Sequence, residues 1–121
     1  MIRTFKGTSP TVDPSAYVDQ SAQVIGDVQI GAESSVWMNV VIRGDVNHIR
    51  IGKRTNIQDL TMVHVMRRRI RPSSGDEVTV GHSAVIHGCT IEDRVLIGMA
   101  GDAARTACTS SMIRSSPPAR C

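Results

Sequence analysis

The chain has 121 residues and a net charge of +3, and only Phe5, Tyr17 and Trp37 are aromatic. A chain of this length has room for one modest core, which must be filled by aliphatic side chains because aromatic bulk is scarce. So few rings to stack bases, and no basic helix, argue against nucleic acid as a partner. No apolar run reaches the length of a membrane span, so we expect no membrane insertion.

The cysteines are Cys89, Cys108 and Cys121, too few and too scattered to predict a disulfide framework. The N-terminal residues lack the apolar stretch of a secretory signal. A reducing, cytoplasmic location is therefore expected.

Aliphatic residues recur every six positions, a period that fits neither an α-helix nor an alternating hairpin strand. The series is Val12, Val18, Val24, Ile30, Val36 and Ile42, then Ile51, Ile57 and Val63, then Val80 and Ile86, then Ile91 and Ile97. Small or β-branched residues follow four positions later, Val46 among them. Each hexapeptide predicts one short strand and one corner, and three of them complete one coil of a three-sided solenoid. The sequence thus predicts an all-β parallel β-helix. A β-sandwich, the alternative, does not keep a six-residue register for so long.

The register breaks after Ile42, Val63 and Ile86. The first break adds three residues and the last removes one. The middle break leaves a basic loop at residues 67–73, because residues 74–79 read as one further degenerate hexapeptide. We expect that loop to be solvated, with steering of anions as the alternative.

Residues that directly follow the aliphatic position stack at one corner of the prism. Arg43, His64 and His87 are therefore predicted on three consecutive coils, with Asp45 nearby. His64 and His87 should lie one strand spacing apart, about 4.8 Å. That spacing suits two imidazoles that bind one ion.

His82 belongs to a different corner, where Gln58 and Asp59 lie one coil earlier. Neighbouring corners are separated by a side of up to ~20 Å, whereas zinc–nitrogen bonds are only about 2 Å long. His82 can therefore complete the His64–His87 pair only from a neighbouring chain, as in three prisms packed about a threefold axis.

The stretches Arg43-Gly44-Asp45 and Asn56-Ile57-Gln58-Asp59, followed by His64, His82 and His87, resemble the γ-class carbonic anhydrases in order and spacing. The resemblance implies a left-handed β-helix and a homotrimer. It also implies reversible hydration of carbon dioxide to bicarbonate by metal-bound hydroxide, which would make the protein a lyase. The three histidines would bind Zn²⁺, or Fe²⁺ or Co²⁺ in its place, at the interfaces between subunits.

The resemblance also assigns catalytic roles. Gln58 and Asp45 would orient the hydroxide, while Arg43, paired with Asp59 across the interface, would hold the site together and favour the anionic product. Val46 departs from the family, because well-characterised relatives have a proton-exporting glutamate there, and the loop that is acidic in them is basic here. These departures weaken the case for rapid hydration more than the case for metal binding.

Three other functions stay open. One is a metal-dependent hydrolase of coenzyme A thioesters, and another is a hexapeptide acyltransferase with a histidine as general base. The third is a catalytically silent assembly subunit. His48, in the three-residue insertion, is assigned no role.

The predicted β-helix domain covers residues 1–98, and residues 99–121 read as an aperiodic tail of Ser, Arg, Pro and Ala. A flexible tail is one interpretation. The other is a reading-frame shift, because codons from Arg105 onward, read from their third base, permit a translation with aliphatic hexapeptides. Sequencing the encoding DNA would test that hypothesis.

Overall fold

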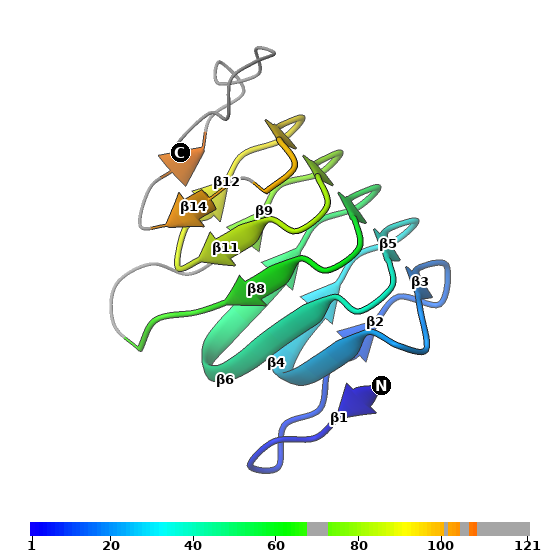
Figure 1. Cartoon of the computed structure of the whole chain (residues 1–121). Helices are drawn as coiled ribbons and strands as arrows, with labels where there is room; N and C mark the ends of the chain where they lie inside the picture. The colour runs from blue at the N-terminus through cyan, green and yellow to red at the C-terminus, as the bar shows by residue number, and fades with distance from the viewer. Residues whose placement is uncertain (68–72, 101, 105–106, 109–121) are drawn as a thin grey trace.

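The computed structural model describes residues 1–67, 73–100, 102–104 and 107–108. Short parallel strands stack coil upon coil into a β-solenoid (Figure 1). This architecture confirms the predicted all-β parallel β-helix and fits the left-handed β-helix of hexapeptide repeats. The described residues contain no helix, and therefore none long and apolar enough to cross a membrane.

The strands form two sheets. The larger sheet contains β1 (Ile2–Arg3), β2 (Thr11–Val12), β4 (Gln23–Ile30), β6 (Val41–Ile51), β8 (Met62–His64), β9 (Ser73–Ser74), β11 (Val85–His87), β12 (Thr90–Ile91), β14 (Asp102–Ala104) and β15 (Ala107–Cys108). The smaller sheet contains β3 (Tyr17–Val18), β5 (Ser35–Val36), β7 (Asn56–Ile57), β10 (Thr79–Val80) and β13 (Leu96–Ile97). The larger sheet covers two sides of the prism because β4 and β6 each continue round a corner.

The core is a column of aliphatic side chains inside the prism. Val24, Ile42, Val63 and Ile86 pair from coil to coil, and all are buried. Burial of apolar surface stabilises a fold by roughly 25 cal/mol per Å². Because a single coil cannot enclose its own side chains, each coil depends on its neighbours.

One position of the small, β-branched series departs from the others. Val46 is exposed, and Ile49 is buried and paired with Val28, a member of the same series one coil earlier. The inserted residues make β6 bulge outwards after Gly44, so the equivalent buried position comes three residues later.

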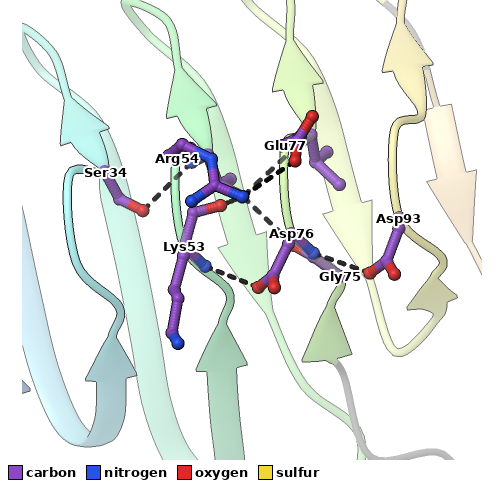
Figure 2. Close-up of polar contacts among 9 residues, drawn as sticks. Ser34, Lys53, Arg54, Gly75, Asp76, Glu77 and Asp93 are labelled. Atoms are coloured by element: carbon purple, nitrogen blue, oxygen red, sulfur yellow. Dashed lines mark hydrogen bonds and ion pairs between the residues drawn. The ribbon is translucent and has the colours of Figure 1, made fainter.

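Two of the three corners turn through a non-glycine residue with positive φ, three positions after the inward residue. These residues are Glu33, Asn39, Arg54, Leu60, Glu77, Ser83, Arg94 and Ala100. Side chains also join the same corner in successive coils, as Figure 2 shows. Asp76 accepts a hydrogen bond from the backbone N–H of Lys53 at 2.7 Å, and Asp93 accepts one from the backbone N–H of Asp76 at 2.8 Å. These bonds satisfy backbone groups that the turns leave unpaired.

The third corner is the one that follows the inward residues Ile42, Val63 and Ile86, and all three breaks in the register fall there. There the chain takes nine, eleven and five residues in successive coils to reach the next inward position. Ser74 pairs with both Ile51 and Ile91, which confirms the additional repeat predicted for residues 74–79. Most of the basic loop predicted at 67–73 lies outside the described residues. Irregular backbone on a rigid scaffold is where binding sites concentrate.

Strand stacking continues past the predicted end of the repeat, because β14 and β15 pair with β11 and β12. The boundary between a domain at residues 1–98 and a tail at 99–121 stays a prediction. The frame-shift hypothesis also stays a hypothesis, because most of the tail lies outside the described residues.

The close approach of β4 and β6 gives a stability prediction. Gly26 and Gly7 both have φ near +80°, at 79° and 80°, but a Cβ at Gly26 would lie 2.3 Å from the carbonyl oxygen of Gly44, whereas one at Gly7 meets nothing within 4 Å. We expect Gly7→Ala to lower the free energy of unfolding by about 1 kcal/mol and Gly26→Ala by a further ~1–3 kcal/mol. Denaturant titration measures both, and equal losses would contradict the close approach.

Candidate metal centre

The third corner carries the stacked residues that the register predicts. In the β-ladder Arg43 is the register partner of His64, and His64 is the register partner of His87, at the ends of adjacent parallel strand segments. The imidazole rings of His64 and His87 are parallel to within 7°, and their centroids are 5.3 Å apart. Two imidazoles on neighbouring coils therefore face the same side of the prism.

Asp45 joins this pair into a polar cluster. Its Oδ1 accepts a hydrogen bond from Nε2 of His64 at 2.9 Å. Arg43 is shared between the two, because its Nε lies 3.6 Å from Oδ2 of Asp45 and its Nη2 lies 3.4 Å from Nδ1 of His64. The structure thus brings together Arg43, Asp45, His64 and His87.

The carboxyl of Asp45 is tuned by these contacts. Burial would raise its pKa, but the hydrogen bond from His64 and the charge of Arg43 outweigh burial, so the pKa of Asp45 is lowered. The carboxyl is therefore ionised at neutral pH. A negative charge beside two imidazoles favours a cation at this corner.

The remaining predicted site residues lie at the corner between the two sheets. Nδ1 of His82 lies 2.8 Å from Oδ2 of Asp59, and the His82 side chain is 48% exposed. Gln58 precedes Asp59, and its backbone N–H bonds to the carbonyl oxygen of Val80 at 3.0 Å. The predicted contact between Arg43 and Asp59 is not formed within the chain, because Arg43 contacts Asp45 and Asp59 contacts His82.

One chain therefore carries two half-sites, the first made of His64, His87 and Asp45 and the second of His82, Asp59 and Gln58. Across the part of the chain that the structure describes, no three His, Cys, Asp or Glu side chains are grouped to hold a metal ion. The separation agrees with the corner argument from the sequence.

The donor set fits a transition-metal ion such as Zn²⁺, which imidazole nitrogens bind well. With Nδ1 of His82 beside the Asp59 carboxylate, Nε2 is the nitrogen left to bind a cation. Carboxylates placed in this way orient metal-ligating histidines. At the first half-site a cation would replace either the Asp45 contact or the Arg43 contact of the His64 ring. The remaining contact would hold the ring in place.

No family model matches the chain. The protein "Gamma carbonic anhydrase 2, mitochondrial" of Arabidopsis thaliana is 57% identical over 96 residues, which cover 75% of this chain and 34% of that protein. A "Probable carbonic anhydrase" of Methanocaldococcus jannaschii is 50% identical over 88 residues, which cover 73% of this chain and 55% of that protein. Among solved structures, a hexapeptide transferase family protein from Anaplasma phagocytophilum matches with a TM-score of 0.70 and 36% identity over 88% of this chain and 69% of that one.

The chain belongs to the γ-class carbonic anhydrase-like family of hexapeptide-repeat proteins. It spans 34% and 55% of the length of the two curated relatives. The resemblance inferred from the order of its Arg, Asp, Gln and His residues is therefore confirmed at the level of the family.

Sequence reasoning missed an N-terminal hairpin beside the first half-site of this γ-class carbonic anhydrase-like chain. Lys6 and Gly7 both have positive φ, and the antiparallel bridge from Phe5 to Thr8 closes a turn around them. The hairpin borders an open cavity of about 240 Å³ that Asp45 and the unassigned His48 also line. The only sequence signal was a glycine at a tight turn.

The Asp45 cluster predicts a directional change in a carboxyl pKa. Arg43→Met removes a positive charge beside Asp45, so we expect the pKa of that carboxyl to rise towards its ordinary value. Carboxyl-carbon NMR of the metal-free chain measures the titration midpoint. Arg54→Met is the matched control because Arg54 pairs with Glu77 at another corner, and it should leave the Asp45 midpoint unchanged. An unmoved midpoint in Arg43→Met would show that Arg43 does not act on Asp45.

Proposed function

We propose that the chain is a metal-dependent, carbonic anhydrase-like lyase that reversibly hydrates carbon dioxide to bicarbonate at sites shared within a homotrimer. The division of the site between two corners carries this proposal. His64 and His87 lie together while His82 lies apart, so a second copy would supply the third imidazole. A metal-loaded preparation that exchanges ¹⁸O between carbon dioxide and water would support the activity.

Exposed apolar side chains support an interface at the half-sites. Met62 is 41% exposed and Val85 37% exposed on the side that leads to the stacked histidines. Met38 is 45% exposed and Leu60 62% exposed at the corner of His82. Apolar patches that border a polar site are typical of protein interfaces. Packing one prism against the next would bury this surface and bring the half-sites together.

The two stacked histidines of one subunit and His82 of another would hold Zn²⁺, or Fe²⁺ or Co²⁺ in its place. When bound, such a metal supplies a Lewis acid with an open coordination position, where the pKa of water falls to about 7. Asp45 balances the cation and fixes the His64 ring through its hydrogen bond. The Gln58 amide would orient the attacking oxygen. Arg43 would bind the anionic product, since a guanidinium matches a planar carboxylate.

A hexapeptide acyltransferase is the second candidate, favoured by the similarity to the hexapeptide transferase family protein from Anaplasma phagocytophilum. In that case a histidine would act as general base towards an acyl donor. Such activity would survive chelation of metal ions, whereas the proposed hydration would not. Assays of both reactions with and without a chelator separate the two functions.

Shared sites predict complementation between inactive variants. A mixture of His82→Ala and His64→Ala chains should regain metal binding and activity, because the first variant keeps the stacked pair and the second keeps His82. A mixture of His64→Ala and His87→Ala is the matched control, because neither chain keeps an intact pair. Metal content and turnover are measured after refolding together. Equal values in both mixtures would contradict a shared site.

Gln58 belongs to the second half-site and would act there as an orienting group, so its loss should affect turnover and leave metal binding intact. We expect Gln58→Ala to lower kcat by about 10²-fold with metal content close to that of the unmodified protein. Gln29→Ala, at an exposed position of β4, should change neither quantity. A parallel loss of metal and activity in Gln58→Ala would give Gln58 a structural role.

A further inference from the structure

The inserted segment of β6 holds a histidine in a fixed place beside the first half-site. Gly26 pairs with Gly44 and Val28 with Ile49, so residues 45–48 bulge out opposite the single residue Asp27. The segment is anchored at both ends. Ile49 is buried in the core, while Asn47 accepts a hydrogen bond from the backbone N–H of His48 at 2.9 Å and donates one to the carbonyl oxygen of Met66 at 3.4 Å.

The bulge and the N-terminal hairpin line the open cavity of about 240 Å³. Its walls are formed by Phe5, Lys6, Thr8, Asp27, Gly44, Asp45, Asn47 and His48. A cavity of this volume with polar walls has room for several water molecules. Asp45 lies in this wall and also bonds to His64. The cavity therefore reaches Asp45, which contacts a histidine of the candidate metal centre directly.

The charged groups around His48 come from three elements. Lys6 comes from the hairpin, Asp27 from β4 and Asp45 from β6 itself. Each carboxylate already has a cationic partner, because Asp27 pairs with Arg50 at 2.7 Å and Asp45 with Arg43 at 3.6 Å. His48 is the one imidazole among the residues that line the cavity, and histidine is the side chain that most often serves as a proton shuttle in proteins.

We propose that His48 accepts the proton that hydration releases and passes it to solvent. This inference rests on the proposed function. Hydration converts carbon dioxide and water into bicarbonate and one proton, which must leave before the next turnover. Through water in the cavity, that proton reaches a ring nitrogen of neutral His48, and the resulting imidazolium gives it to a buffer base.

The test replaces His48 in the metal-loaded, assembled protein. His48→Gln should lower kcat in dilute buffer by about tenfold or more, while kcat/KM, which reports interconversion of carbon dioxide and bicarbonate, stays within about twofold. Concentrated imidazole buffer should restore kcat, and metal content and oligomer mass should not change. Val46→Ala, in the same bulge with an exposed side chain, is the matched control and should behave like the unmodified protein.

The outcomes separate the relay from the proposed function. Unmodified protein that exchanges ¹⁸O, together with an unchanged kcat in His48→Gln, would overturn the relay alone. Equal losses of kcat and kcat/KM that imidazole does not restore would also overturn it. Loaded protein without any exchange would overturn the proposed function and the relay together.

Discussion

The parallel hydrogen-bond ladder between coils is the constraint on which the rest of the structure depends. Since each coil bonds to the next in fixed register, a residue after an inward position lies beside its counterpart in the preceding coil. This register places the His64 and His87 rings with centroids 5.3 Å apart. Corner bonds, such as that from the backbone of Lys53 to Asp76, stabilise the same stacking. A site built on such a ladder is rigid before any ligand arrives.

The six-residue period predicted the fold and the stacking of His64 on His87, because both follow directly from register. It also predicted that His82 lies at another corner. It did not reveal that Ile49, and not Val46, is the buried counterpart of Val28, because the length of an insertion does not say which of its residues bulge outwards. The N-terminal hairpin and the cavity beneath it arise from packing between segments that share no repeat, so periodicity could not reveal them.

The division of the site between two corners has a physical consequence. A half-site with two imidazole ligands leaves a metal ion partly coordinated, so tight binding would require a second copy to present His82. Exposed apolar side chains lie next to both half-sites, Met62 near the stacked histidines and Leu60 near His82. Assembly and metal binding would therefore stabilise each other, since a ligand that binds only the assembled state favours that state. The irregular third corner, in contrast, supplies Asp45 and His48, which a regular repeat would not place there.

In the proposed assembly a metal ion is bound between copies of the chain and not within one. Native mass spectrometry of the Zn²⁺-loaded protein distinguishes these arrangements, because it reports the number of chains and of metal ions in the same particle. Metal should be found in assemblies of three chains, with one ion per interface, and isolated chains should carry none. A single chain that retains Zn²⁺, or a three-chain assembly that takes up no metal, would contradict the proposed assembly.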